Sequence, residues 1–209
     1  MNHRQAPSRH GVHPVLAAVV MLASCAVPPV TLYTLSPPPR DTLGPPARAG
    51  TETPLGRHPI VIAIARVTLP DHLDTRDILV RHGAVLESSH TGRWASRLSL
   101  GVTELVTGRL GQGRPDALVT DQPQTTAPSY RVLINVSRLD LATEGGTTQG
   151  TATLEADWQI IPRDPAVPAS RDRTRIGVVG PMATDPEVVA LTTVILNRLA
   201  TAIDLTRMR

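Results

Sequence analysis

The sequence predicts an α+β domain, in which a mixed, largely antiparallel sheet carries two long helices on one face. Residues 60–67 form an almost uninterrupted run of β-branched apolar side chains, which is typical of a central strand covered on both faces. Residues 151–161 alternate between apolar and polar side chains up to Ile160, as a strand with one solvent-exposed face does. Two further segments repeat apolar residues at three- and four-residue steps, which indicates amphipathic helices.

Composition and charge exclude several classes of protein. The 209 residues suit a single domain with a tail, and their 41% hydrophobic content is too high for a disordered chain. The chain has no lysine, and 21 arginines face 18 acidic residues. Arg4 and Arg9 lie in the first 24 residues, which contain no acid, so the remainder has 19 arginines against 18 acids. A net charge of +1 gives little electrostatic steering, and we expect no nucleic-acid partner.

The N-terminal segment reads as an export signal. Basic residues precede an apolar run at 15–24, which is too short to cross a bilayer as a helix but fits the core of a signal peptide. The run ends in Leu22, Ala23, Ser24 and Cys25, which resembles the bacterial lipobox. We therefore expect a signal peptide over 1–24 and a lipid on Cys25. An ordinary signal peptide with an incidental cysteine is the alternative.

Cys25 is the only cysteine, which excludes an intrachain disulfide and a thiolate zinc site. Ala26 follows it, where an aspartate would resemble the inner-membrane retention signal, so the sequence favours the outer membrane.

Residues 25–59 read as a lipidated, proline-rich tether, with nine prolines over 26–59. A polyproline conformation of about 3.1 Å per residue would let it reach roughly 100 Å. Within it, 31–35 alternates and could add a strand to the domain. The folded periplasmic domain is expected over 60–209.

The remaining elements follow from the same patterns. Beyond 60–67, the expected strands are 78–81 and 84–88 on either side of Gly83, then 116–121, 130–141, 151–161 and 174–179, with a turn beginning at Glu144. The first helix is expected over 93–110 and is stopped by Gly111 and Gly113. The second is expected from Pro186 to about Thr206, begun by a capping box of Thr184 and Glu187.

Most apolar side chains on these elements are assigned to the core. They include Trp94, Trp158 and the stripe of the last helix: Val188, Leu191, Thr192, Ile195, Leu199 and Ile203. Docking of a partner on that stripe is the alternative. Arg171, Arg173 and Arg175 alternate along a strand, so they share a face that could meet lipid phosphates or a partner's acids, or protect an edge strand.

No pattern in the chain indicates catalysis. There is no G-x-S-x-G motif, and the single thiol is assigned to lipid attachment. Asp71, His72, Asp74, Asp77 and His82 cluster in sequence, but their spacing matches no known set of metal ligands. We expect no enzymatic activity, cofactor or metal. A lipid-anchored hydrolase using His72 or Asp74 is the weakest alternative.

Three segments carry a resemblance to a known family. They are 67–73 (VTLPDHL) after the buried strand, 78–81 (ILVR), and 93–98 (RWASRL) at the start of the expected helix. In order and spacing they resemble the ABC-type transport auxiliary lipoproteins, the PqiC-like outer-membrane lipoproteins of MCE lipid transport. The resemblance covers most of 22–204. His72 stands where the family commonly has tyrosine, and Arg97 where it often has proline.

The resemblance implies a non-enzymatic function. Such a lipoprotein sits in the outer membrane by its lipid anchor and docks or receives a conduit of MCE-domain proteins, which an inner-membrane ABC permease and ATPase serve. Some members of the family form rings, which implies a homo-oligomer. The family pattern is densest at the residues that we expect to contact the partner: Pro70, Asp71, His72, Leu73, Arg93, Trp94 and Arg97. The alternative is a structural or assembly lipoprotein of another envelope complex.

Overall fold

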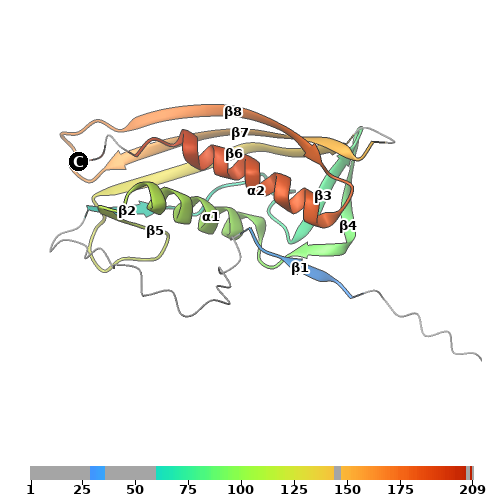
Figure 1. Cartoon of the computed structure of the whole chain (residues 1–209). Helices are drawn as coiled ribbons and strands as arrows, with labels where there is room; N and C mark the ends of the chain where they lie inside the picture. The colour runs from blue at the N-terminus through green and yellow to red at the C-terminus, as the bar shows by residue number, and fades with distance from the viewer. Residues whose placement is uncertain (1–28, 36–59, 144–146, 206–207, 209) are drawn as a thin grey trace, which may run out of the picture.

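The computed structural model of the protein describes residues 29–35, 60–143, 147–205 and 208. The expected signal peptide, the lipobox, Cys25 and the turn at Glu144 lie outside the described residues (Figure 1).

One eight-stranded sheet organises the domain, with β6 at its centre. One edge of β6 pairs with β7, which pairs in turn with β8; the other edge pairs with β2 in its first half and with β3 in its second. β2 continues the sheet to β5, and β3 continues it through β4 to β1. The strands are β1 (Thr31–Tyr33), β2 (Ile60–Ile64), β3 (Asp77–His82), β4 (Val85–Trp94), β5 (Ala117–Thr120), β6 (Tyr130–Thr143), β7 (Gln149–Pro162) and β8 (Ser170–Pro181).

The sheet is mixed, as expected. Antiparallel pairing covers the three most extended interfaces, namely β6 with β7, β7 with β8, and β3 with β4. Parallel pairing joins β1 to β4, β5 to β2, and both β2 and β3 to β6 over shorter stretches. The apolar run at 60–67 is therefore a central strand between two neighbours. Beyond Ile64 the chain still follows β6, since the Ala65 amide donates to Val132 O at 2.9 Å and the Thr68 amide to Ile134 O at 3.0 Å.

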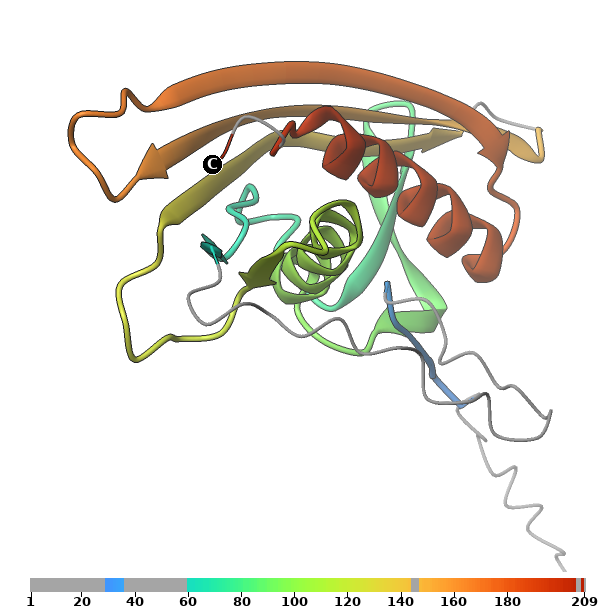
Figure 2. The ribbon, with the colours of Figure 1, turned by 60° about the vertical axis from the view of Figure 1, so that its left-hand side comes forward.

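Both helices lie on the concave side of the sheet, beneath the arch of β6, β7 and β8 (Figure 2). α1 (Leu98–Gly113) packs against β5 and α2, and α2 (Asp185–Ala202) packs against β8 and β7. The helices are 16 and 18 residues long, which is moderate rather than long. The prediction of a mixed sheet with two helices is confirmed, but the prediction that both helices are long is not.

The core lies between the sheet and the helices, as the patterns predicted. The apolar face of β7 is buried along its whole length, and so are Trp94 and Trp158. Every residue assigned to the stripe of the second helix is buried. α2 begins with the expected cap, since the Thr184 amide donates to Glu187 Oε2 at 2.9 Å. The tight turn between β3 and β4 places Gly83 at a φ of 61°, where a side chain would be strained.

The start of the first helix was predicted too early. Arg93 and Trp94 belong to β4, where they pair with Leu32 and Tyr33 of β1. The spacing of Trp94 and Leu98 imitates a helical step, but Leu98 is the first helical residue. The end was also predicted too early, because α1 continues through Gly111 and Gly113 and is capped at Arg114, whose amide donates to Gly111 O at 3.1 Å.

The second helix ends at Ala202 rather than near Thr206, which lies outside the described residues. Leu205 and Met208 are nevertheless buried. The buried Arg114 guanidinium holds this end of the chain, because it donates to the carbonyls of Leu205 and Met208 while forming a two-pronged pair with the Asp116 carboxylate. The hydrogen bond to Asp116 raises the pKa of Arg114, and it outweighs burial, which by itself would lower that pKa.

Candidate partner-contact site

The loop that follows β2 forms the centre of the expected contact site. Pro70 O accepts hydrogen bonds from the amides of Leu73 at 2.9 Å and Asp74 at 3.1 Å, which folds residues 70–74 into a compact turn. Leu73 points inward and is buried, whereas Asp71 and His72 are exposed. We call residues 70–76 the contact loop.

The contact loop caps the first helix. α1 has no acidic residue in its first turn, and its own N-cap residue, Arg97, makes no side-chain cap. The Ser99 amide instead donates to Asp74 Oδ1 at 3.0 Å, and the Leu98 amide donates to Thr75 O at 3.0 Å. Two N–H groups that a helix start leaves unpaired are thus satisfied by the contact loop, and the Asp74 charge faces the positive end of the helix dipole.

The environment of Asp74 favours its charged form. Burial by itself would raise the pKa of this carboxyl, but the hydrogen bond from the Ser99 amide and the positive charges of Arg97 and Arg66 outweigh it and hold the pKa below its usual value. The Arg97 guanidinium lies 3.7 Å from Asp74 Oδ2 and is mostly exposed. Arg97 therefore stands at the surface beside the cap.

Replacing Asp74 by alanine should lower the free energy of unfolding by about 1–2 kcal/mol, because the start of α1 loses both its cap and a dipole-compensating charge. Chemical denaturation of the soluble domain measures this. Asp71→Ala is the matched control, since Asp71 is exposed in the same loop, and it should change stability by less than about 0.5 kcal/mol. Equal losses for the two variants would contradict the assigned cap.

Further contacts join the contact loop to the junction between β4 and α1. The Arg76 guanidinium donates to Trp94 O at 3.2 Å and to Ala95 O at 2.9 Å, while the Trp94 amide returns a hydrogen bond to Arg76 O at 2.8 Å. Arg93 forms an ion pair with Asp77, directly after the loop. The structure thus brings together the two segments in which the family pattern is densest.

Not all of the expected contact residues reach the surface. Leu73 and Trp94 are 7% and 4% exposed, so their side chains belong to the core and position the site rather than face a partner. Asp71, His72 and Arg97 are exposed, while Pro70 and Arg93 are partly exposed. Asp74 and Arg76, which build the site, were not among the expected contact residues.

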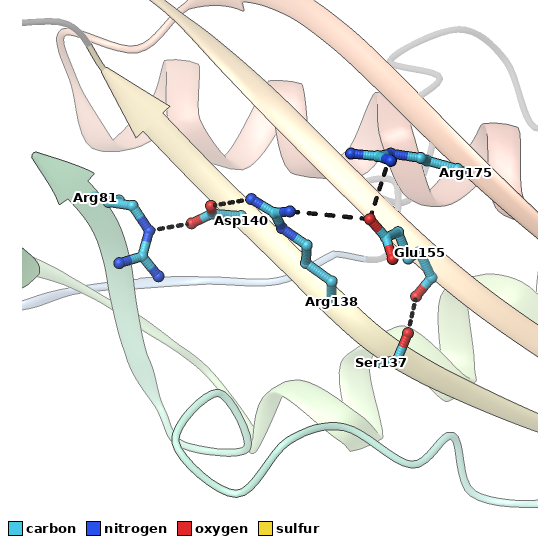
Figure 3. A network of polar contacts seen from close by, with 6 residues as sticks. All are labelled: Arg81, Ser137, Arg138, Asp140, Glu155 and Arg175. Carbon is cyan, nitrogen blue, oxygen red and sulfur yellow. Dashed lines mark hydrogen bonds and ion pairs between the residues drawn. The ribbon is translucent and has the colours of Figure 1, made fainter. Parts of the chain in front are cut away.

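A network of charged side chains lies on the face of the sheet that points away from the helices (Figure 3). Asp140 accepts from Arg81 Nε at 2.7 Å and from the Arg138 guanidinium at 3.0 Å. Arg138 also lies 3.9 Å from Glu155 Oε1, which Arg175 Nε approaches to 3.3 Å. The network links β3, β6, β7 and β8 across the sheet.

The charge of Asp140 is stabilised in the folded protein. Its burial would raise the pKa, but hydrogen bonds and charges from Arg81 and Arg138 lower it overall. A lowered pKa means that the unfolded chain takes up the proton first as the pH falls. The stabilisation from Asp140 and Asp74 is therefore present at neutral pH and is lost as the pH falls below about 4.

Thermal unfolding followed from pH 7 to pH 3 should show this loss as a falling Tm, and Asp140→Asn should make the fall shallower, because the neutral amide does not titrate. A Tm that falls equally steeply in Asp140→Asn would show that this carboxyl contributes nothing to the acid sensitivity.

The three alternating arginines share the face of this network. Arg171, Arg173 and Arg175 lie opposite Gln159, Asp157 and Glu155 in the β7–β8 register. Within the described part of the chain, β8 pairs with β7 alone, so these arginines do lie on an edge strand. Arg171 contacts Gln159 Oε1 at 3.4 Å.

Among the residues that the structure describes, no three His, Cys, Asp or Glu side chains gather in a group that could hold a metal ion. In that same part of the chain, neither helix has the length and apolarity needed to span a bilayer.

Comparison with known proteins extends these observations. A family model matches residues 42–204, which include the contact loop, both helices and all strands except β1. The matched class comprises lipoproteins that accompany ABC-type transport. The chain belongs to the family of ABC-type transport auxiliary lipoprotein components. Membership places it among membrane-anchored lipoproteins of the cell envelope and associates it with ABC transport.

Solved structures share the fold at low sequence identity. A crystal structure of an uncharacterised protein is 12% identical and has a TM-score of 0.62, with 83% of this chain and 95% of that chain aligned. A Xanthomonas campestris protein of family DUF330 is 16% identical with a TM-score of 0.56, covering 72% of this chain and 86% of that one. No curated protein matches the sequence significantly. At these identities the likeness concerns the fold alone.

Proposed function

We propose that this chain is a non-enzymatic lipoprotein of the outer membrane that docks or receives the periplasmic conduit of an ABC/MCE-type lipid transport system. The observation that carries the proposal is the family match over residues 42–204, behind a lipobox that ends in Cys25. The family supplies the association with ABC transport, and the lipobox supplies the means of anchoring.

The anchor is the first part of the proposal. The Cys25 thiol accepts the lipid, and cleavage before Cys25 removes the signal peptide over 1–24. Ala26 rather than aspartate follows the cysteine, which supports delivery to the outer membrane with the domain facing the periplasm. Several acyl chains on one residue give stable anchoring, because a single chain binds a membrane only marginally.

The contact loop is the second part. Asp71, His72 and Arg97 are exposed, whereas the neighbouring Leu73 and Trp94 side chains belong to the core. The Asp74 cap and the Arg76 bonds fix the loop to the start of α1. Such a surface is preorganised, so docking of an MCE-domain protein would cost little ordering entropy.

A photo-crosslinking residue placed at His72 tests this surface in cells. We expect a crosslink to an MCE-domain protein or to the ABC permease. The matched control carries the same residue at Ala166, which is also exposed but lies in the β7–β8 connection, away from the contact loop. Crosslinks from both positions to the same proteins would contradict the assigned surface. A crosslink to an unrelated envelope machine would instead favour the structural or assembly alternative.

Homo-oligomerisation is the third part, since the family includes ring-forming members. Sedimentation of the lipid-free domain over a concentration series tests it, and we expect larger species to grow in as the concentration rises. A single monomeric species up to the limit of solubility would contradict ring formation by this domain alone.

A further inference from the structure

The N-terminal strand is tightly built into the domain. β1 pairs in parallel with the end of β4, which places Leu32 beside Arg93 and Tyr33 beside Trp94. The Ala95 amide donates to Tyr33 O at 2.7 Å. Leu35 is only 4% exposed and lies so close to Gly101 of α1 that a Cβ on this glycine would stand 3.4 Å from Leu35 Cδ1. The described segment 29–35 therefore belongs to the folded unit.

The position of β1 limits how far the domain can stand from its anchor. Only six residue steps separate Cys25 from Thr31, the first residue of β1. At no more than about 3.3–3.6 Å per residue, these steps span roughly 20 Å. The expected tether of 25–59 would have allowed roughly 100 Å. The proline-rich stretch 36–59 contributes nothing to this distance, because Leu35 before it and Ile60 after it both belong to the domain.

We propose that β1 holds the domain against the membrane surface, with the edge formed by β1 and the end of β4 facing the lipid. This inference rests on the proposed lipidation of Cys25. The partner of this edge is a phospholipid bilayer, because at most about 20 Å of chain separates the edge from the lipid anchor in the bilayer. Val30 and Leu32 are 46% and 58% exposed there. Exposed apolar side chains of this kind are suited to contact with the lipid headgroup region.

The arrangement sets an orientation for the whole domain. The β7–β8 connection lies at the opposite end of the molecule from β1 in both views (Figures 1 and 2). It should therefore point away from the membrane. Arg97 lines the same hollow as Tyr33 and Leu35, so one exposed residue of the candidate contact site lies on the membrane-facing edge.

Energy transfer from a donor dye on the lipidated protein to acceptor lipids in phosphatidylethanolamine–phosphatidylglycerol vesicles tests this orientation. Acylated Cys25 leaves no other thiol, so one added cysteine is labelled selectively. His90→Cys places the dye near β1, two residues before Gly92, the β4 partner of Thr31. Ala166→Cys places it on the exposed β7–β8 connection. We expect stronger transfer from position 90 than from position 166, and equal transfer would overturn the orientation.

Two insertions decide which segment sets the distance. A 20-residue Gly/Ser insert after Val27 adds about 25 Å of root-mean-square length and should lower the transfer from position 90. The same insert after Pro46 should leave it unchanged. Loss of transfer with the second insert, or no loss with the first, would overturn the inference. Neither insert interrupts a strand or helix of the described domain.

Failure of the anchor itself gives a different result. If Cys25 carries no lipid anchor, Cys25→Ala should partition with vesicles to the same extent as the unchanged chain, regardless of the inserts. In that case both the anchor and the orientation are wrong. If Cys25→Ala is lost from the vesicles but the inserts act in the opposite sense, the anchor stands and only the role of β1 is overturned.

Discussion

Cells that produce Cys25→Ala are expected to release the protein from the membrane fraction. The chain has no second cysteine that could accept a lipid, and in the described part of the chain no helix could span a bilayer instead. Each buried methylene of an acyl chain contributes about 0.8 kcal/mol to membrane binding, so loss of all chains removes the anchor rather than weakening it. Fractionation measures the release from the membrane, and the intact mass of the protein shows the loss of the acyl chains.

The control for this variant keeps Cys25 and changes another lipobox residue conservatively. Ser24→Ala retains a small side chain before Cys25, so processing and membrane association should persist. If Cys25→Ala stays in the membrane fraction with the mass of the processed wild-type chain, the lipid anchor is disproved. If it is soluble but still carries residues 1–24, both processing and anchoring depend on the thiol, as proposed.

Trp158→Ala should destabilise the domain more than Asp74→Ala or Asp140→Asn. Trp158 is 5% exposed and lies opposite Ile134 in the β6–β7 register, in the layer that faces the helices. Truncating a buried tryptophan removes its transfer free energy and leaves a cavity, at a cost of about 3–5 kcal/mol. Because a domain of this kind is stable by only about 5–15 kcal/mol, a large part of the total is lost.

Chemical denaturation of the soluble domain measures this loss. Val179→Ala on the neighbouring strand β8 is the control, since Val179 is 71% exposed and its truncation should change stability by less than about 0.5 kcal/mol. Losses of similar size for Trp158→Ala and Val179→Ala would mean that Trp158 does not form part of the core.

Periodicity predicted the elements whose environment repeats along their length. β7 has one face toward the helices and one toward solvent, so its alternation shows directly in the sequence. α2 lies on the sheet along one stripe and begins at a capping box, and both features are local. For such elements a residue's neighbours in the chain determine its environment.

The errors arose where distant segments decide the structure. Trp94 has helical spacing to Leu98, but its backbone pairs with β1, which lies far earlier in the chain. The cap of α1 comes from Asp74, 25 residues before Ser99, so no capping pattern precedes the helix. The alternation at 31–35, within the expected proline-rich tether, did predict β1, but only the structure shows that this strand pairs with β4.

The sequence indicated the region of the candidate contact site but not the side chains that build it. The family pattern pointed to the contact loop and to the start of α1, and the structure joins them through Asp74 and Arg76. Leu73 and Trp94 were named as contact residues from the family pattern, and Trp94 was also assigned to the core; both are buried, because a dense family pattern marks packing as readily as contact. The charged network around Asp140 had no local signal, since its members come from four strands.

Recovery of partners from native membranes tests the central claim most directly. Cells expressing the full, lipidated chain with a C-terminal tag are crosslinked mildly, solubilised and subjected to affinity capture, and the captured proteins are identified by mass spectrometry. Cys25→Ala, captured in parallel, shows which partners require the anchor. We predict recovery of an MCE-domain protein together with an ABC permease or its ATPase. Capture of a different envelope machine without any of these proteins would contradict the proposed role in lipid transport.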